Sequence, residues 1–248
     1  MSSLHKFFVA REQIINNQVT LTGSDVSHIR TVLRLKAGDS IQVISDSGKC
    51  LTVRLVEVKT KEVKGEVVAS VTINVESPLA VHLGQALTKG NKFDVILRKS
   101  VELGVRSITP LMTERCVVKT HRTEVGKKIE RWKKIVLESS KQCGRSKIPL
   151  VAEDVETLET FCRKNDHQDL KLIFWELEEK KTLKDIQLDA QPRSVAVLIG
   201  PEGGFSQAEI ENVREYGFQT VGLGPRILRA ETAPVVALAL LQSRWGDL

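Results

Sequence analysis

The pattern of apolar and polar positions changes once along the 248-residue chain, near residue 73. Before this point, short runs rich in β-branched residues are typical of strands. They lie at 6–9, 18–22, 40–44 and 50–58. After it, strand-like and helix-like stretches alternate, which predicts a mostly parallel sheet covered by helices. We therefore expect an α/β protein with two domains, 1–72 and 73–248.

One helix is expected within the strand-rich first domain, beginning at the cap Ser24-Asp25. Its apolar face is formed by Val26, Ile29, Val32 and Leu33. Arg30 and Arg34 lie on the opposite face, and Asp46-Ser47-Gly48 signals a hairpin between two strands. These features indicate a small β-barrel with a basic helix beside it.

The second domain is predicted to alternate strands and helices. Strands are expected at 80–87, 107–111, 170–175, 194–199 and 219–223. Helices are expected at 91–103, 124–142, 206–216 and 232–245.

Two Gly-rich turns follow the last two predicted strands. The first reads IGPEGGFS at 199–206 and the second LGPRILRAET at 223–232. Loops with so few side chains let backbone N–H and C=O groups approach a ligand closely. Each turn alone is compatible with an ordinary strand-to-helix connection. As a pair, with Arg229 and Glu231 between them, they indicate a ligand site.

The sequence motifs of several common kinds of site are absent from the chain. Neither turn carries the Lys-Ser/Thr of a phosphate-binding P-loop, and Gly222-Leu223-Gly224 continues into Pro225 instead of a dinucleotide fingerprint. GxSxG is absent, and the histidines and cysteines show no metal-ligand spacing. A ligand held mainly by backbone remains. Methyl transfer from S-adenosyl-L-methionine suits such a site, because the sulfonium is already an activated leaving group and positioning is the main task.

Composition and charge indicate what kind of partner the protein binds and in which compartment it lies. The chain is 41% hydrophobic and 27% charged, and its net charge of +6 is uneven. From Lys89 to Lys147 there are sixteen Lys/Arg and six Asp/Glu, so this segment carries 16 − 6 = +10 and the rest 6 − 10 = −4. Such a concentration indicates a polyanion, with a solvated helix face as the alternative. No apolar run reaches about 18 residues, and the four scattered cysteines are expected to be core thiols in a reducing cytoplasm. Neither a membrane nor a metal is therefore expected.

The motifs resemble those of a known family. The runs IGPEGGFS, LG at 223–224, ILR at 227–229 and ETA at 231–233 are similar to the signature of the RsmE family of 16S rRNA methyltransferases, within the SPOUT superfamily. Further matches include QAL at 85–87, ELGV at 102–105, QCGR at 142–145 and VLRL at 32–35. The resemblance covers nearly the whole chain.

This resemblance implies a fold and an activity. It implies an N-terminal PUA-like β-barrel and a C-terminal SPOUT α/β domain with a trefoil knot, the knot and cofactor site lying at about 170–248. It also implies a homodimer that methylates N3 of a uridine in bacterial 16S rRNA of the small ribosomal subunit. The alternatives are another SPOUT methyltransferase acting on tRNA or a 2′-hydroxyl, a non-catalytic RNA-binding module, and a dinucleotide-binding oxidoreductase.

Site residues follow from the same resemblance. The cofactor is expected to contact Leu198, Ile199, Gly200, Pro201, Glu202, Gly203, Gly204, Leu223, Gly224, Ile227, Leu228, Thr232 and Ala233. Arg229 is the predicted catalytic residue, because a guanidinium can stabilise the charge left on uracil when N3 loses its proton; an ion pair with Glu231 or Glu202 is the structural alternative. Contacts to rRNA phosphates are predicted for Arg30, Arg34, Lys36, Lys89, Lys92, Lys99, Arg115 and Arg145.

Overall fold

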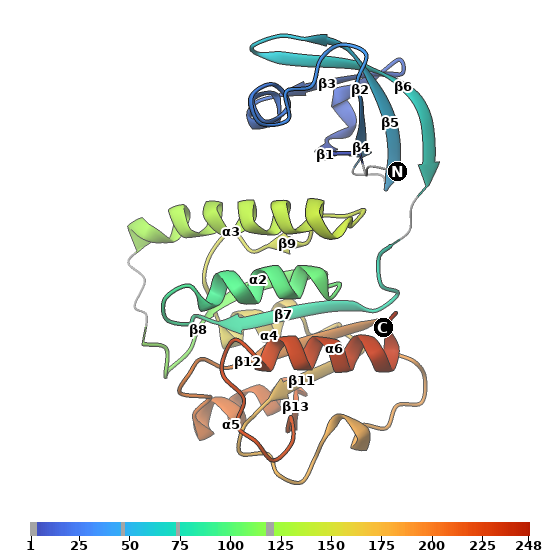
Figure 1. Ribbon diagram of the computed structural model, residues 1–248. Helices are drawn as coiled ribbons and strands as arrows, with labels where there is room; N and C mark the ends of the chain where they lie inside the picture. Colours follow the sequence, from blue (N-terminus) through green and yellow to red (C-terminus); the bar gives the residue numbers. More distant parts are fainter. Residues whose placement is uncertain (1–3, 46–47, 73–74, 118–121) are drawn as a thin grey trace. The chain divides into compact units, whose positions relative to one another are not determined.

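Two compact units make up the chain. The computed structural model describes residues 4–45, 48–72, 75–117 and 122–248. The first unit comprises Met1–Glu76 and Ser140–Ile148, and the second Ser77–Ser139 and Pro149–Leu248 (Figure 1). The predicted division at residue 72 did not anticipate that a segment from the middle of the chain belongs to the first unit.

A six-stranded sheet forms most of the first unit, in the order β1-β4-β5-β6-β3-β2. β1 pairs with β4 in parallel, and the other neighbours are antiparallel. The strands are β1 (Lys6–Val9), β2 (Ile14–Ile15), β3 (Gln18–Thr22), β4 (Ser40–Ser45), β5 (Lys49–Val58) and β6 (Glu62–Thr72). All four predicted strands are present, whereas the long β6 was missed. Gly65 interrupts its pattern and is needed there, because a Cβ would lie 2.4 Å from Val53 Cγ1 on β5.

The helix of the first unit has an unexpected register. A short α1 (Ser24–Ser27) continues into a π-helical turn (His28–Val32), in which the Leu33 N–H donates to His28 O at 2.9 Å. Val26 and Ile29 are buried as predicted, but Val32 is 66% exposed because the wider turn rotates it away from the core. Arg30 and Arg34 are exposed.

The predicted hairpin is present as an antiparallel pairing of β4 with β5. The Gly48 N–H donates to Ser45 O, and Gly48 adopts a positive φ of 77°. Residues 46 and 47 of the predicted turn lie outside the described residues.

The second unit is built on a parallel sheet. The order is β10-β8-β7-β12-β11-β13, with β9 also paired to β8. Every pairing is parallel. The strands are β7 (Ala80–Ala86), β8 (Ser107–Met112), β9 (Leu150–Val151), β10 (Glu156–Thr157), β11 (Leu170–Phe174), β12 (Ser194–Ile199) and β13 (Gln219–Val221). The five predicted strands are confirmed to within two residues.

Helices cover both faces of this sheet. They are α2 (Lys92–Glu102), α3 (Arg122–Cys143), α4 (Leu158–Lys164), α5 (Gln207–Glu215) and α6 (Ala233–Trp245). One face packs against α2, α3 and α6, and the other against α4 and α5. On β12, Val195 and Val197 enter the first core while Ala196 and Leu198 enter the second, which explains the continuous apolar run. Only α4 was not predicted.

The cysteines are all free. Cys50 and Cys162 are buried core thiols as expected, and burial raises the pKa of Cys162 to about 12. Cys143 is exposed, so the expectation of a core thiol is wrong at that position. Within the described ranges, no helix is both long and apolar enough to span a membrane.

A buried ion pair joins the segment Ser140–Ile148 to the rest of the first unit. Arg145 pairs with Glu76, and the side chains are 7% and 13% exposed. The same carboxylate accepts the N–H groups of Ser146 at 2.9 Å and Lys147 at 3.0 Å. Arg145 was predicted to contact RNA. Because its guanidinium is buried on Glu76, we leave it out of the RNA-contacting set.

Replacing Glu76 by Gln should destabilise the first unit. The variant leaves a buried guanidinium without its counter-charge, so the free energy of unfolding at pH 7 should fall by about 3 kcal/mol. Burial raises the pKa of Glu76. Arg145 and the N–H groups of Lys147 and Ser146 lower that pKa by more than burial raises it, so the net pKa lies below the ordinary value. Such a carboxyl stabilises the fold above its unfolded pKa and loses this effect as the pH falls through the folded pKa.

Urea unfolding followed by circular dichroism across a pH series measures this difference. The gap between wild type and Glu76→Gln should close below about pH 4. Glu66→Gln, at an exposed glutamate of β6, is the matched control. An unfolding midpoint at pH 7 that Glu76→Gln leaves unchanged would contradict the prediction.

Candidate functional site

Three loops leave one edge of the parallel sheet side by side. Phe174, the last residue of β11, is in register with Ile199 on β12 and with Val221 on β13. Because the three strands run parallel, the loops that follow them begin at the same edge, where open α/β sheets bind ligands. Both predicted Gly-rich turns are among these loops. The loop after β11, 175–182, is the third.

The first loop, 200–206, is folded tightly by its glycines and its cap. The Gly204 N–H donates to Pro201 O at 3.0 Å, and Gly204 has a φ of +66°. A Cβ on Gly204 would lie 1.7 Å from Glu176 Oε1, so the Glu176 carboxylate occupies the space that a side chain would need, and the positive φ also favours glycine. Ser206 then caps α5. Its Oγ accepts the Glu209 N–H, and the Glu209 carboxylate accepts the Ser206 N–H.

The second loop, 222–232, offers backbone donors. A Cβ on Gly222 would lie 2.2 Å from Glu178 O, so the backbone approaches the third loop closely here too. Among the residues the structure describes, the N–H groups of Leu223, Ile227 and Leu228 have no acceptor within the chain. The Leu223 and Leu228 side chains are half-buried, whereas Ile227 is 84% exposed.

Glu178 holds the third loop against β13. Its carboxylate accepts the Thr220 hydroxyl at 2.8 Å and the N–H groups of Lys180 and Lys181 at 3.1 Å. The Thr220 hydrogen bond is the main cause of a lowered pKa at Glu178, so the group stays ionised. Sequence reasoning missed this contact, which joins residues 42 positions apart and has no sequence signal.

Trp175 leaves an unused donor beside these loops. Its backbone N–H donates to Val221 O at 3.1 Å, but its indole Nε1 is buried and has no partner in the described part of the chain. An orphaned buried donor indicates a missing acceptor. At the end of β7, Gln85 Oε1 and Thr88 Oγ1 are also buried and unpartnered. A glutamine inside the apolar run 80–87 was the sequence signal for that position.

Charged side chains gather around the two Gly-rich loops. Glu202 Oε1 accepts the Lys89 N–H and Lys92 Nζ, both at 3.0 Å. Lys92 Nζ also lies 3.7 Å from Glu231 Oε2. Burial raises the pKa of Glu202, but the hydrogen bond from Lys92 and backbone N–H groups outweigh it, so the net pKa is lowered. Arg115, predicted to contact RNA, donates to Gly203 O at 3.0 Å.

Arg229 is exposed. The structural alternative was an ion pair with Glu231 or Glu202. In the described ranges both carboxylates pair with Lys92, and Arg229 makes no ion pair. Its backbone carbonyl accepts the N–H groups of Thr232 and Ala233, which fixes the loop to the start of α6.

The other predicted RNA contacts lie on the surface. Arg30, Arg34 and Lys36 of the first unit, and Lys89, Lys99 and Arg115 of the second, are exposed. Lys99 pairs with Glu102 at 2.7 Å on the same helix. Phe205, which follows the first Gly-rich loop's glycines, is only 1% exposed and packs in the core.

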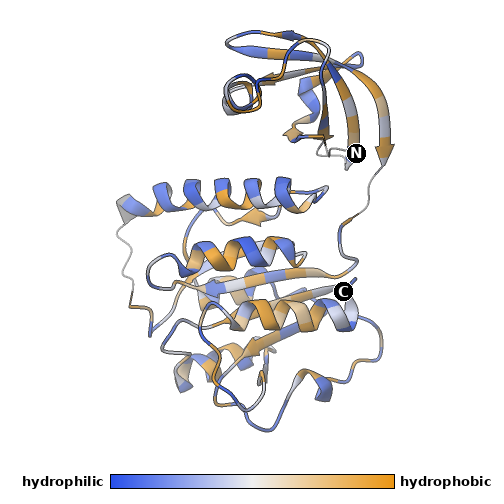
Figure 2. Cartoon of the chain, in the orientation of Figure 1, coloured by the Kyte–Doolittle hydropathy of each residue, from blue (hydrophilic) through white to orange (hydrophobic). Residues whose placement is uncertain are grey.

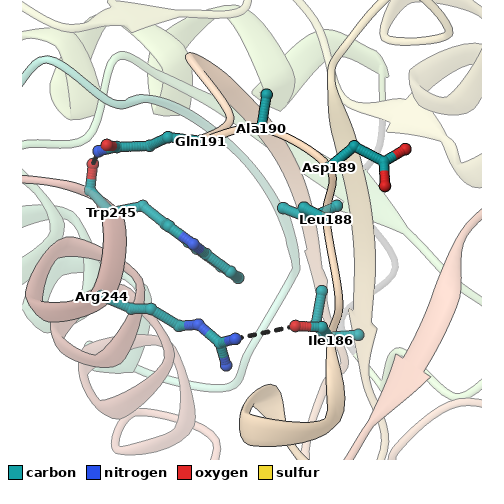
Figure 3. A pocket seen from close by; sticks show the side chains of 7 residues that line it. All are labelled: Ile186, Leu188, Asp189, Ala190, Gln191, Arg244 and Trp245. Atoms are coloured by element: carbon teal, nitrogen blue, oxygen red, sulfur yellow. Dashed lines mark hydrogen bonds between the residues drawn. The ribbon is translucent and has the colours of Figure 1, made fainter.

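A pocket of about 310 Å³ lies elsewhere in the second unit (Figure 3). It is lined by segment 186–191 and the end of α6. Arg244 donates to Ile186 O at 2.8 Å, and its guanidinium lies 4.6 Å from the Trp245 ring centroid, so these residues fix the end of the helix. None of the predicted cofactor residues lines this pocket. Among the residues that the structure describes, no cluster of His, Cys, Asp or Glu is suited to a metal.

Comparison with known proteins adds independent findings. Residues 75–242 match the family model described as RNA methyltransferase domain, and residues 21–68 match that described as RNA methyltransferase PUA domain. Ribosomal RNA small subunit methyltransferase E of Buchnera aphidicola subsp. Schizaphis graminum is 36% identical over 94% of each chain. The protein of the same name from Bacillus subtilis is 34% identical over 90% of this chain and 88% of its own.

Solved structures resemble the whole chain. A methyltransferase from Legionella pneumophila with bound S-adenosylmethionine is 38% identical, with a TM-score of 0.90 over 99% of each chain. Ribosomal RNA small subunit methyltransferase E from Neisseria gonorrhoeae, also bound to S-adenosylmethionine, is 33% identical, with a TM-score of 0.86 over 99% of each chain. With this similarity along its whole length, the chain belongs to the RsmE family, the ribosomal RNA small subunit methyltransferases E.

Proposed function

We propose that the protein transfers a methyl group from S-adenosyl-L-methionine to N3 of a specific uridine in 16S rRNA of the small ribosomal subunit. The observation that carries this proposal is the meeting of three close-approaching loops at one edge of the sheet, in a member of the RsmE family. Two solved relatives hold S-adenosylmethionine. An rRNA substrate agrees with the expected cytoplasmic location.

The residues present fit the cofactor. Unpartnered N–H groups at Leu223, Ile227 and Leu228, and the orphaned Trp175 indole, are donors suited to an adenine and a carboxylate. Glycines at 200, 203 and 204 leave the first loop with few side chains. The groups that would hold the cofactor are Leu198, Ile199, Gly200, Pro201, Glu202, Gly203, Gly204, Leu223, Gly224, Ile227, Leu228, Thr232 and Ala233. When bound, S-adenosylmethionine supplies a methyl group on a sulfonium, which is an activated leaving group.

Arg229 is proposed as the catalytic residue. Methylation of uracil at N3 requires loss of the N3 proton, which leaves negative charge on O2 and O4. The Arg229 guanidinium has no ion partner among the described residues and is available to stabilise that charge. Glu202 is a poor proton acceptor, because Lys92 and the Lys89 N–H occupy its carboxylate and lower its pKa. We therefore assign Glu202 to the loop structure.

Exposed cations are proposed to contact the rRNA. In the described ranges, the side chains of Arg30, Arg34, Lys36 and Lys89 are exposed and make no ion pair. Lys99 and Arg115 are exposed as well, although each also binds a group of the protein. Lys and Arg contacts to phosphates release counterions, so binding should weaken steeply with salt.

We also propose a homodimer formed through α6. Figure 2 shows this helix coloured as hydrophobic along most of its length. Leu240 is 45% exposed, and Val235, Val236 and Ala239 are half-buried. A helix that is apolar on every face needs a protein surface on each side. Ile227, on the loop that precedes α6, is also exposed.

Two finer features of the fold belong to the same proposal. The first unit is proposed to close as a PUA-like barrel, which its strongly bent six-stranded sheet supports. The C-terminal segment is proposed to form a trefoil knot. β13 pairs with β11 instead of its predecessor β12, and the Gly222 N–H binds Lys181 O at 2.8 Å, which supports this. A crystal structure whose trace stays knotted when its ends are pulled tests the knot.

Labelled cofactor tests the reaction. Methyl transfer to isolated 30S subunits from a strain lacking the enzyme should yield N3-methyluridine in 16S rRNA, identified by nuclease digestion and mass mapping. Naked 16S rRNA and tRNA are parallel substrates, and a 2′-O-methyl product or a labelled tRNA would contradict the proposed target. Calorimetry with S-adenosylmethionine accompanies the assay, and absence of binding would favour a non-catalytic RNA-binding module.

Replacing Arg229 by Ala should slow chemistry without weakening cofactor binding. Loss of one group that stabilises developing charge lowers rates by about 100-fold to 1,000-fold. Single-turnover methyl transfer at saturating cofactor measures this step. Arg226→Ala removes a second exposed arginine from the same loop and should keep the wild-type rate. An unchanged rate in Arg229→Ala would remove this residue from the mechanism.

Replacing Leu240 by Glu should produce a monomer. A charge on the apolar face of α6 would have to be desolvated in the dimer, which is unfavourable. Light scattering after gel filtration measures the mass. Leu150→Glu, at a leucine of β9 that is 67% exposed, is the matched control and should remain dimeric. A monomeric wild-type protein, or a dimeric Leu240→Glu variant, would overturn the proposed interface.

A further inference from the structure

One ammonium group touches both Gly-rich loops. Lys92 is the first residue of α2, and its Nζ lies 3.0 Å from Glu202 Oε1 in the first loop and 3.7 Å from Glu231 Oε2 in the second. The Lys89 N–H, just before the helix, also donates to Glu202 Oε1 at 3.0 Å. The start of α2 therefore joins two loops that are separated by about one strand and one helix in the sequence.

The three charged side chains are only partly exposed. Lys92 is 38% exposed, Glu202 25% and Glu231 24%. An isolated surface ion pair contributes little, but a shared cation that serves two half-buried carboxylates forms a network. Glu231 Oε2 is buried and accepts no hydrogen bond in the described residues, so Lys92 supplies its counter-charge. Loss of Lys92 would leave that oxygen buried beside no cation.

This network also determines what Arg229 does. Arg229 lies near enough to Lys92 for their positive charges to repel, and it stands two residues before Glu231. Both carboxylates are nevertheless taken by Lys92. Without the ammonium, Glu202 and Glu231 would lose their counter-charge, and Arg229, whose charge already acts on Lys92, would be available to pair with them.

We propose that Lys92 is a positioning residue, which holds the two cofactor loops together through Glu202 and Glu231 and keeps Arg229 free of an ion partner. This inference rests on the proposed function of the loops. It replaces the expectation from sequence that Lys92 contacts RNA phosphate. Lys99 pairs with one exposed carboxylate on its own helix, whereas Lys92 is shared by two half-buried carboxylates on two different loops.

Cofactor affinity separates the two roles. Lys92→Ala should weaken S-adenosylmethionine binding about tenfold by calorimetry, because the loops lose their shared contact. Lys92→Arg, which keeps the charge and the hydrogen-bond donors, should recover most of the affinity. Arg98→Ala removes an exposed cation from the same helix and should bind the cofactor as wild type does. Thermal melts of each variant show whether it is folded.

RNA binding tests the alternative role of Lys92 as a phosphate contact. Fragments of 16S rRNA are titrated at several salt concentrations, with Arg30→Ala/Arg34→Ala as the variant expected to lower the salt slope. Lys92→Ala should leave this slope unchanged. If Lys92→Ala binds the cofactor with wild-type affinity, with or without a reduced salt slope, the inference is overturned while the proposed function stands. A wild-type chain that binds no S-adenosylmethionine would overturn the proposed function and this inference with it.

A rescue experiment tests the effect on Arg229. Lys92→Ala should lower the single-turnover rate even at saturating cofactor, since the freed carboxylates capture the guanidinium. Adding Glu202→Gln and Glu231→Gln to this variant removes the competing charges and should restore part of the rate. A merely structural role for Lys92 predicts a further loss in the triple variant. That loss would contradict the proposal.

Discussion

The site depends on the register of one strand. Phe174 on β11 is aligned with both Ile199 on β12 and Val221 on β13, so the three loops that follow start at equal height on the same edge. A slip of one residue in either pairing would exchange the two buried faces of the strand concerned. Both faces are packed, by α2, α3 and α6 on one side and α4 and α5 on the other, so the register is fixed by core packing. The position of the loops therefore follows from the apolar core.

Close approach of the loops follows from that alignment. At Gly204 and Gly222, an added Cβ would collide with Glu176 and with Glu178 O respectively. Glycine lets the backbone of the second loop pass close to that of the third loop at Gly222, and it makes room for the Glu176 carboxylate at Gly204. Glu178, bonded to Thr220, then prevents the third loop from moving away. Stiffness at this edge comes from hydrogen bonds that the loops make with each other.

Sequence reasoning predicted the strands and helices well and the charged contacts poorly. The run 194–199 and the helices around it could be predicted because periodicity reports burial directly. A residue such as Arg145 gives no such signal. Whether an arginine faces solvent or Glu76 is decided by contacts 69 positions apart, which only the fold brings together. The π-turn that exposes Val32 was equally hidden, since a single added residue in a turn leaves the apolar pattern intact.

The carboxylate partners of Lys92 are also far from it in the sequence and gave no sequence signal. These contacts show how charge is arranged at the proposed site. Two carboxylates, one ammonium and one guanidinium stand close together there, and their formal charges cancel. A strongly basic site would repel a sulfonium, and a strongly acidic one would repel the phosphates of an RNA. Pairing Lys92 with both acids satisfies the half-buried carboxylates without using Arg229. These four side chains thus balance one another while one cation stays available for the charge that develops on the base during the reaction.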